Sequence, residues 1–222
     1  MIEGVTRAEA LAMRSPRQGD GNPDIMRNRF WRMMIYARKP ASWARQAFDI
    51  DSSGPTWCFV RRGRCVVQLR DQRILYVGGS HEDFYDPDFC IYNDVVVEQI
   101  DGTYEIFAYP ERIFPPSDFQ SATVVGHELY LIGSLGYRDR RRPGETQALA
   151  LDLDTLAMRP VETFGDGPGW VYGHQAEWNR ARNTIAIWGG QRMVWKGDEM
   201  ASEQLGEARY ELDLATQLWT AT

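Results

Sequence analysis

The sequence predicts a mostly β protein built of three similar four-stranded sheets, preceded by a short helical segment. Three observations carry this prediction. From Thr56 onward, strand-like runs alternate with Gly, Pro, Asp and Asn every 8–14 residues, a spacing typical of all-β proteins. Three apolar runs end in a similar phrase, and its glycines, Gly78, Gly133 and Gly189, lie 55 and 56 residues apart. The N-terminal part of the chain lacks these features and shows helical spacing instead.

This N-terminal part contains an apolar stripe. Asp24 can cap a helix in which Met26 and Phe30 share one face. Pro40 ends that helix, because a proline ring clashes with the preceding turn of a continuing helix. We expect Met26, Phe30 and Trp31 to be buried against the β region rather than exposed to a partner.

The three β units repeat the same order of segments. A short turn joins a small apolar strand to the strand that ends in glycine, and a long loop then leads to a third strand, which a tight turn joins to a fourth. Repeats of about 20 to 50 residues are typical of solenoids and propellers. The expected strands are residues 65–69, 74–79, 93–97 and 104–109, then 121–125, 129–134, 147–151 and 158–161, and finally 174–178, 185–190, 208–212 and 218–221.

Four antiparallel strands at a period of about 50 residues are typical of kelch-type propeller blades. Gly78-Gly79 and Gly189-Gly190 supply the double glycine that follows an apolar strand, and Gly133-Ser134 stands in its place in the second unit. On these residues, the chain resembles the kelch and galactose-oxidase-like β-propeller family over about residues 57–222. The segment Tyr85–Val97 is similar to short bacterial kelch-like proteins.

The resemblance implies a kelch-like β-propeller of three four-stranded blades. A helical segment, residues 1–55, would pack on this β domain, residues 56–222, whose blades would span about 57–110, 115–163 and 170–222. Closed propellers have about four to eight blades, so three would leave two faces uncovered. The N-terminal segment, a second copy of the chain in a homodimer, or a larger partner could cover them.

Composition limits the classes of function. The net charge is −6, and residues 80–120 carry ten acids against one base. The short arginine run at 138–142 is typical of a solvated loop tip, so a nucleic-acid partner is not expected. No apolar run approaches the about 18 residues of a membrane span, and no secretory signal is evident. Three cysteines without C-x-x-C spacing indicate a cytoplasmic protein that has no disulfide framework.

The long connections of the repeat are expected on one face. In a four-stranded blade this face carries the loops between the second and third strands, here residues 80–92, 135–146 and 191–207. Repeat proteins often place insertions on their binding face. We therefore expect non-enzymatic binding of another protein, which the acidic stretch predicts to be basic, such as a toxin neutralised by its immunity protein. The candidate binding residues are His81, Glu82, Asp83, Phe84, Tyr85, Asp86, Asp88, Phe89, Tyr137, Arg140 and Trp195.

An enzyme is the alternative. The first long loop offers ligands for a hard cation or a transition metal, namely His81, Asp83, Asp86 and Asp88. With His174, they could form the centre of a metal-assisted or carbohydrate-acting enzyme. The copper site of galactose-oxidase-like enzymes uses two histidines, two tyrosines and a cysteine cross-linked to a tyrosine, a set with no evident match here. No nucleophile elbow, P-loop or dinucleotide motif occurs, so no catalytic residue and no cofactor is assigned.

Overall fold

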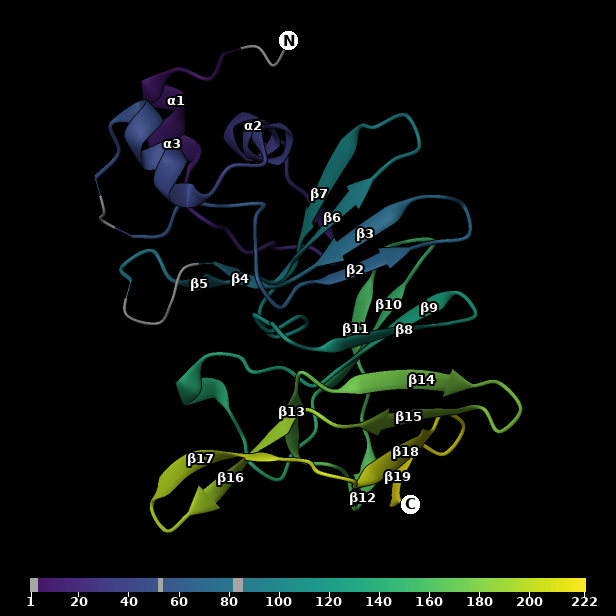
Figure 1. Ribbon diagram of the computed structural model, residues 1–222. Helices are drawn as coiled ribbons and strands as arrows, with labels where there is room; N and C mark the ends of the chain where they lie inside the picture. Colours follow the sequence, from purple (N-terminus) through teal and green to yellow (C-terminus); the bar gives the residue numbers. More distant parts are fainter. Residues whose placement is uncertain (1–3, 52–53, 82–85) are drawn as a thin grey trace. The chain divides into compact units, whose positions relative to one another are not determined.

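The computed structural model describes residues 4–51, 54–81 and 86–222 (Figure 1). The prediction of a mostly β protein is confirmed: three short α-helices accompany several sheets, none of them closed within those ranges. None of the described helices has the length and apolar composition that a membrane span requires. The chain divides into two compact units, residues 1–110 and 111–222.

Unit 1, residues 1–110, contains the helices and an antiparallel sheet with the strand order β1-β7-β6-β3-β2. A separate pair, β4 and β5, accompanies it. The elements are α1 (Arg7–Met13), β1 (Asp24–Ile25), α2 (Arg29–Ala37), α3 (Ala41–Phe48), β2 (Cys65–Gln68), β3 (Ile74–Val77), β4 (Ser80–His81), β5 (Cys90–Ile91), β6 (Asp94–Glu98) and β7 (Tyr104–Ala108). Strands β2, β3, β6 and β7 match the four expected ones, and β1 adds an outer strand beside β7.

The helices begin where a side chain satisfies their free backbone N–H groups. Thr6 forms a capping box at α1, and the Asn28 side chain accepts a hydrogen bond from the Trp31 N–H at 3.0 Å in α2. The prediction that Asp24 is an N-cap was wrong. Asp24 lies in β1, and its carboxylate closes a turn ahead of the helix by accepting the Gly21 N–H at 2.9 Å.

The core of unit 1 joins α2 to the sheet. Phe30 and Trp31 are buried, and Trp31 stacks on Trp57 with 5.0 Å between the ring centroids. All three rings belong to a cluster that includes Ile106 of β7, and Met26 packs against it half-buried. Burial of a large apolar side chain contributes about 1.5–3 kcal/mol. The predicted packing of the apolar stripe on the β region is confirmed, with Met26 less enclosed than expected.

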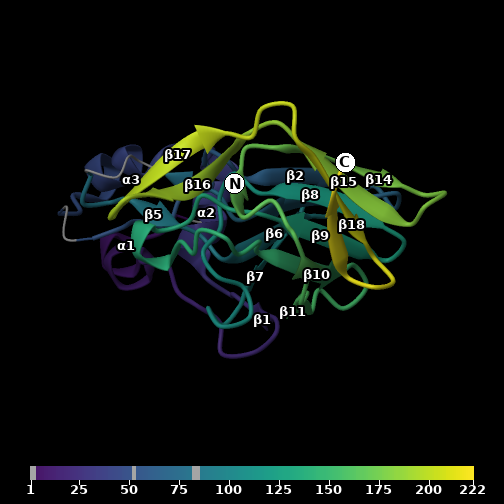
Figure 2. The same ribbon diagram turned by 90° about the horizontal axis from the view of Figure 1, so that it is seen from below.

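Unit 2, residues 111–222, contains three sheets, drawn from green to yellow in Figures 1 and 2. Their strand orders are β11-β10-β9-β8, β12-β19-β18-β15-β14 and β13-β16-β17. The elements are β8 (Ser121–Val125), β9 (Glu128–Ile132), the 3₁₀ helix η1 (Arg138–Arg140), β10 (Ala148–Asp152), β11 (Met158–Pro160), β12 (Phe164–Gly165), β13 (Trp170–Tyr172), β14 (Gln175–Asn179), β15 (Thr184–Trp188), β16 (Gln191–Lys196), β17 (Glu199–Gln204), β18 (Arg209–Asp213) and β19 (Leu218–Ala221). The first two sheets contain the eight strands expected for this part of the chain.

A glycine directly follows the second strand of each repeated sheet. Gly78 follows β3, Gly133 follows β9 and Gly189 follows β15, with φ values of 61°, 72° and 66°. Residues with a Cβ rarely adopt this left-handed conformation, whereas glycine adopts it without steric cost. The three glycines therefore occupy equivalent positions, as their spacing predicted.

Gly133 also lies where two sheets of unit 2 meet. A Cβ at this position would be 2.3 Å from the carbonyl oxygen of Val171 and 2.8 Å from the His174 ring. The Ser134 N–H donates to the same Val171 oxygen at 2.9 Å. Strands β8 and β14 lie side by side, and His174 Nε2 is 2.9 Å from Ser121 Oγ. The missing side chain of Gly133 thus permits β13 to lie close to the end of β9.

The segment expected to be a long loop, residues 191–207, is mostly a hairpin. Strands β16 and β17 pair along their whole length, and β16 also pairs with β13. Gly197-Asp198 forms the two-residue turn, with Gly197 at a φ of 63°. Such a dipeptide between two strand-like runs is a hairpin signal, so the prediction of an irregular loop was wrong here.

Replacing Gly133 with Ala should destabilise the protein more than replacing Gly126. Gly126, in the β8–β9 turn, has a φ of 60°, but a Cβ there would meet nothing within 4 Å. Gly126→Ala should lower the free energy of unfolding by about 1 kcal/mol through backbone strain. Gly133→Ala should add about 1–3 kcal/mol, because the new methyl group overlaps Val171. Denaturant unfolding measures both losses, and equal losses would contradict the close contact at Gly133.

Candidate functional site

The first long loop, residues 80–92, begins and ends in paired strands. Ser80 faces Ile91 and His81 faces Cys90 in the β4–β5 pair. The structure describes four of its candidate binding residues, namely His81, Asp86, Asp88 and Phe89. The other four candidates lie outside the described residues, and these are Glu82, Asp83, Phe84 and Tyr85.

The described acids of this loop are tied to the interior of unit 1. Asp88 is fully buried, and its carboxylate forms an ion pair with Arg45 of α3. Asp86 is half-buried, lies 4.0 Å from the same guanidinium and accepts a hydrogen bond from the Asp88 N–H at 2.8 Å. The charge of Asp88 is therefore neutralised internally. Recognition by this loop stays a prediction that rests on its other residues.

His81 is buried beside a polar network. Its Nδ1 atom lies 2.7 Å from the Tyr92 hydroxyl, which also accepts the Cys58 N–H at 2.9 Å. Burial lowers the pKa of His81 to about 4, and the charge of Arg61 acts in the same direction. The imidazole is therefore neutral near pH 7. Its Nε2 atom has no hydrogen-bond partner among the described residues.

Arg61 and Asp94 hold this network together. The guanidinium donates to both carboxylate oxygens, at 2.5 and 3.0 Å, and to the Cys58 carbonyl at 2.7 Å. It also lies 3.4 Å from the Tyr92 ring centroid, and Trp57 Nε1 donates to Asp94 at 2.8 Å. Loss of one partner from such a buried pair costs about 3–5 kcal/mol. These two charges therefore stabilise unit 1 and are not accessible to a partner.

The acidic stretch of residues 80–120 exposes less charge than its composition suggests. Of its eight described acids, three are buried, namely Asp88, Asp94 and Asp118. Asp101 and Glu105 are exposed on and beside the β6–β7 turn. Fewer than ten carboxylates of this stretch are therefore at the surface and able to attract a basic partner.

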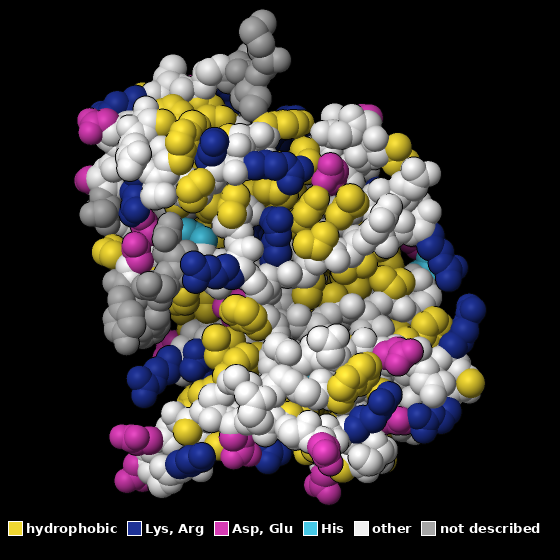
Figure 3. Space-filling model, viewed as in Figure 1, with side chains coloured by type: hydrophobic (Ala, Val, Ile, Leu, Met, Phe, Trp, Pro, Cys, Tyr) yellow, Lys and Arg dark blue, Asp and Glu magenta, His cyan; other side chains and the backbone are white. Residues whose placement is uncertain are grey.

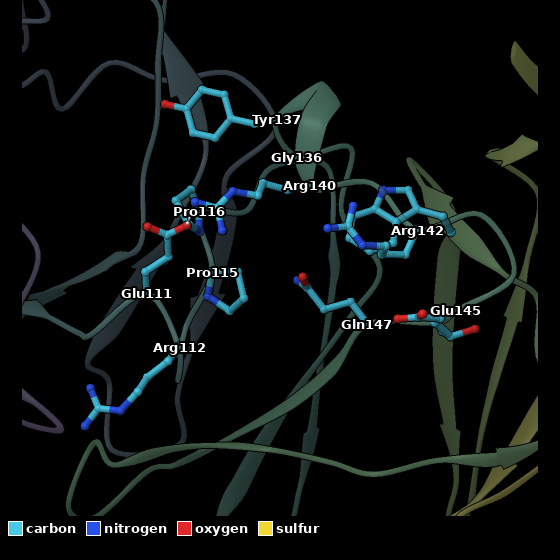
Figure 4. A pocket seen from close by; sticks show the side chains of 12 residues that line it. Glu111, Arg112, Pro115, Pro116, Gly136, Tyr137, Arg140, Arg142, Glu145 and Gln147 are labelled. Carbon is cyan, nitrogen blue, oxygen red and sulfur yellow. Dashed lines mark ion pairs between the residues drawn. The ribbon is translucent and has the colours of Figure 1, made fainter. Parts of the chain in front are cut away.

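A pocket of about 560 Å³ lies within unit 2 (Figure 4). Its walls come from the segment that precedes β8, from the loop between β9 and β10, and from Trp170 at the start of β13. All of these residues lie in connections between strands or at a strand end. The repeat predicts that its long connections lie on one face. Two predicted site residues, Tyr137 and Arg140, line the pocket.

Hydrogen bonds within unit 2 fix the walls of this pocket. The buried Asp118 carboxylate accepts the Gly136 N–H at 2.9 Å. Arg141 donates to the carbonyls of Leu135 and Gly136, at 2.9 and 3.1 Å. Trp170 is buried, and its Nε1 donates to the same Leu135 carbonyl at 3.2 Å. The last of these bonds ties the loop between β9 and β10 to β13.

Several residues that line the pocket were not predicted from the sequence. Arg142 belongs to the arginine run that was interpreted as a solvated loop tip, and Trp170 lies in a glycine-rich link that has no recognisable motif. Arg140, which was predicted, forms an ion pair with Glu111 at 2.9 Å. The four arginines in one long loop are the sequence feature that could have predicted this pocket, because clustered like charges in a connection often face a ligand.

Trp195 lies outside the pocket, on the β16–β17 hairpin. Its side chain is 59% exposed and faces Met200 across the hairpin. Figure 3 shows charged side chains of both signs around the hairpin. Strand β13 connects the two features, because Trp170, which lines the pocket, pairs with Met193 of β16.

His174, the second histidine of the alternative enzyme centre, lies in unit 2, whereas His81 lies in unit 1. It is buried, its Nε2 atom is 2.9 Å from Ser121 Oγ, and burial lowers its pKa to about 4. Among the residues that the structure describes, no three His, Cys, Asp or Glu side chains come together as a metal site would require.

The fold and the pocket define a mostly β protein whose second unit carries a pocket lined by connecting segments. A scan against models of known protein families and a search of the curated proteins found no match for this chain.

Burial of His174 should make the stability of the protein depend on pH. Because its pKa is about 4 in the folded protein and about 6.5 when unfolded, the contribution of the neutral ring is complete above pH 6.5. It is lost as the pH falls toward 4, since the unfolded chain then binds the proton more readily. The free energy of unfolding of the parent protein should therefore fall with decreasing pH in this range. In His174→Gln this slope should be smaller, by an amount that corresponds to the uptake of up to about one proton on unfolding.

Chemical denaturation at several pH values between 4 and 7 measures this slope. The control is His127→Gln, which removes an exposed imidazole from the β8–β9 turn. Equal slopes for His174→Gln and the parent protein would contradict the cost of protonating the buried ring.

Proposed function

We propose that this protein is a non-enzymatic protein-binding module that binds its partner through the loop face of unit 2, which consists of the pocket and the β16–β17 hairpin. The observation that carries this proposal is Trp195, whose side chain is 59% exposed on a regular hairpin. Tryptophan, tyrosine and arginine are enriched among the residues that dominate protein interfaces. Tyr137 and Arg140 add the other two types at the pocket.

The lengths of the connections in unit 2 support the proposal that the loop face is the binding surface. Its two features are built from the connections of the repeat, while the turns between β8 and β9 and between β14 and β15 are short. Folds with repeated sheets commonly vary the connections on one side and keep the strands as a scaffold. The hydrogen bonds that fix the pocket walls reduce the ordering cost of binding.

The proposal includes the architecture of a kelch-like β-propeller with three blades. It is supported by the common order of four strands in the three repeated sheets and by the equivalent glycines Gly78, Gly133 and Gly189. The N-terminal segment, residues 1–55, or a second copy of the chain would complete the incomplete ring.

The partner that we propose is a basic protein, such as a toxin that the module neutralises. The excess of acids in residues 80–120 supports this choice, although only part of that charge is exposed. The cysteine pattern of the sequence favours a cytoplasmic setting. A basic partner would associate faster at low ionic strength, because screening weakens the attraction between exposed charges as salt rises.

A metal-assisted or carbohydrate-acting enzyme centred on residues 81–88 is the second candidate. The buried His81 favours it, because Nε2 has no hydrogen-bond partner among the described residues and Asp86 is near enough to influence the His81 charge. Metal analysis of the purified protein separates the two candidates. A content near one metal per chain, lost in His81→Ala but retained in His127→Ala, would favour the enzyme.

Replacing Trp195 and Tyr137 together with Ala should reduce capture of the partner from an extract of the source cells by about tenfold or more, because central aromatic residues contribute most of the interface energy. The matched control is Val124→Ala, which removes an exposed apolar side chain from β8 of the same unit. Quantitative mass spectrometry of the captured proteins measures the effect. A partner retained equally by both variants would exclude the loop face as its binding surface.

A further inference from the structure

The pocket of unit 2 has the size and walls of a small-molecule site. Ligand pockets commonly have volumes of about 300–1,000 Å³ with mostly apolar walls and a few polar groups, and this one measures about 560 Å³. Pro115, Pro116, Tyr137 and Trp170 supply apolar surface. Figure 4 shows the proline rings and the Gln147 amide around its central space.

The charged groups of the pocket are unevenly paired. Three arginines and two glutamates line it. Arg140 and Glu111 neutralise each other in an ion pair of 2.9 Å. Arg112, Arg142 and Glu145 form no ion pair with any described residue, so the lining retains one positive charge. Exposed charges without partners of this kind are available to a ligand.

Arg142 is the arginine best placed for this purpose. Its Nη1 atom donates to the carbonyls of Asp139 and Arg141, at 3.0 and 2.9 Å, which orients the guanidinium. Figure 4 shows the guanidinium turned toward the space between Pro115 and Gln147. The remaining guanidinium N–H groups form no hydrogen bond with a described residue.

A second guanidinium raises the positive potential of the same loop. Arg141 is half-buried and uses its donors on backbone carbonyls rather than on a carboxylate. Burial lowers the pKa of Arg141, the nearby Tyr172 and Asp118 act in the opposite direction, and the charge of Arg138 lowers it slightly. A bound anion would favour the charged form of this guanidinium.

We propose that the pocket of unit 2 binds a small organic carboxylate, with its apolar body against Pro115 and Trp170 and its acidic group on the guanidinium of Arg142. Arginine recognises carboxylates through paired, charge-assisted hydrogen bonds. The fixed walls hold the apolar surface and the cation at a constant separation. This site goes beyond the proposed protein-binding function and does not depend on it, because its ligand is a small molecule.

Titration calorimetry of the full chain with 3-phenylpropionate tests the proposal. The expected result is binding that weakens as salt rises and that is about tenfold or more weaker for Arg142→Gln, since a hydrogen bond to a charged group is lost. Arg138→Gln is the matched control: it removes an exposed arginine from the same loop that does not line the pocket. It should leave the affinity within about twofold after correction for salt.

Two further probes identify the chemistry that is recognised. The neutral analogue 3-phenylpropanamide should bind at least about tenfold more weakly than the carboxylate. Phenyl phosphate should not bind more tightly, because the lining retains one positive charge and includes Glu145, which forms no ion pair with a described residue. The proposal is overturned by absence of binding at millimolar 3-phenylpropionate, by equal affinity for the amide, by tighter binding of the phosphate, or by equal losses in Arg142→Gln and Arg138→Gln. Both variants should fold like the parent protein, because each replaces an exposed side chain. Unfolding curves of the two variants check this.

Discussion

The contact between Gly133 and Val171 positions most of the candidate site in unit 2. Because Gly133 has no Cβ, the Val171 carbonyl lies against it and accepts the Ser134 N–H at 2.9 Å. This contact holds β13 beside the end of β9, so that Trp170, the residue before Val171, becomes a wall of the pocket. The same strand pairs with β16 through Met193 and supports the hairpin that carries Trp195. This contact, together with the hydrogen bond from Trp170 Nε1 to the Leu135 carbonyl, places the strand that borders both parts of the loop face.

The strands of the repeat could be predicted because their signals are local. Alternation of side chains, two-residue turns and a glycine after the second strand are all written within a few residues of each strand. Strand β1 could not be predicted in this way, since Asp24 pairs with Ala108, far along the chain. The hairpin around Gly197-Asp198 has a local signal as well, although a loop between the second and third strands is expected at this place in the repeat.

The candidate site was less predictable, because the state of a charge depends on partners distant in sequence. Asp88 was expected to bind a partner, yet Arg45 pairs with it inside unit 1. Asp94, counted in the acidic stretch, is paired with Arg61 in the same unit. The arginine run at 138–142 is mostly exposed, as expected of a solvated loop tip. Arg141 is the exception, because it is half-buried and donates to the Leu135 carbonyl. Local composition identifies which residues are charged but not which of them remain available to a ligand.

An acidic chain can contain a cationic pocket, because a bound ligand responds to nearby charges. The net charge is −6, but exposed charges are screened beyond about 8 Å at physiological ionic strength. A ligand inside the pocket of unit 2 therefore responds mainly to Arg142 and its immediate neighbours, rather than to the sum over the chain. A macromolecular partner responds instead to the charges spread over its whole contact surface. Attraction of a basic protein and binding of a small anion are thus compatible, because each depends on the charges within a screening length of its own contact.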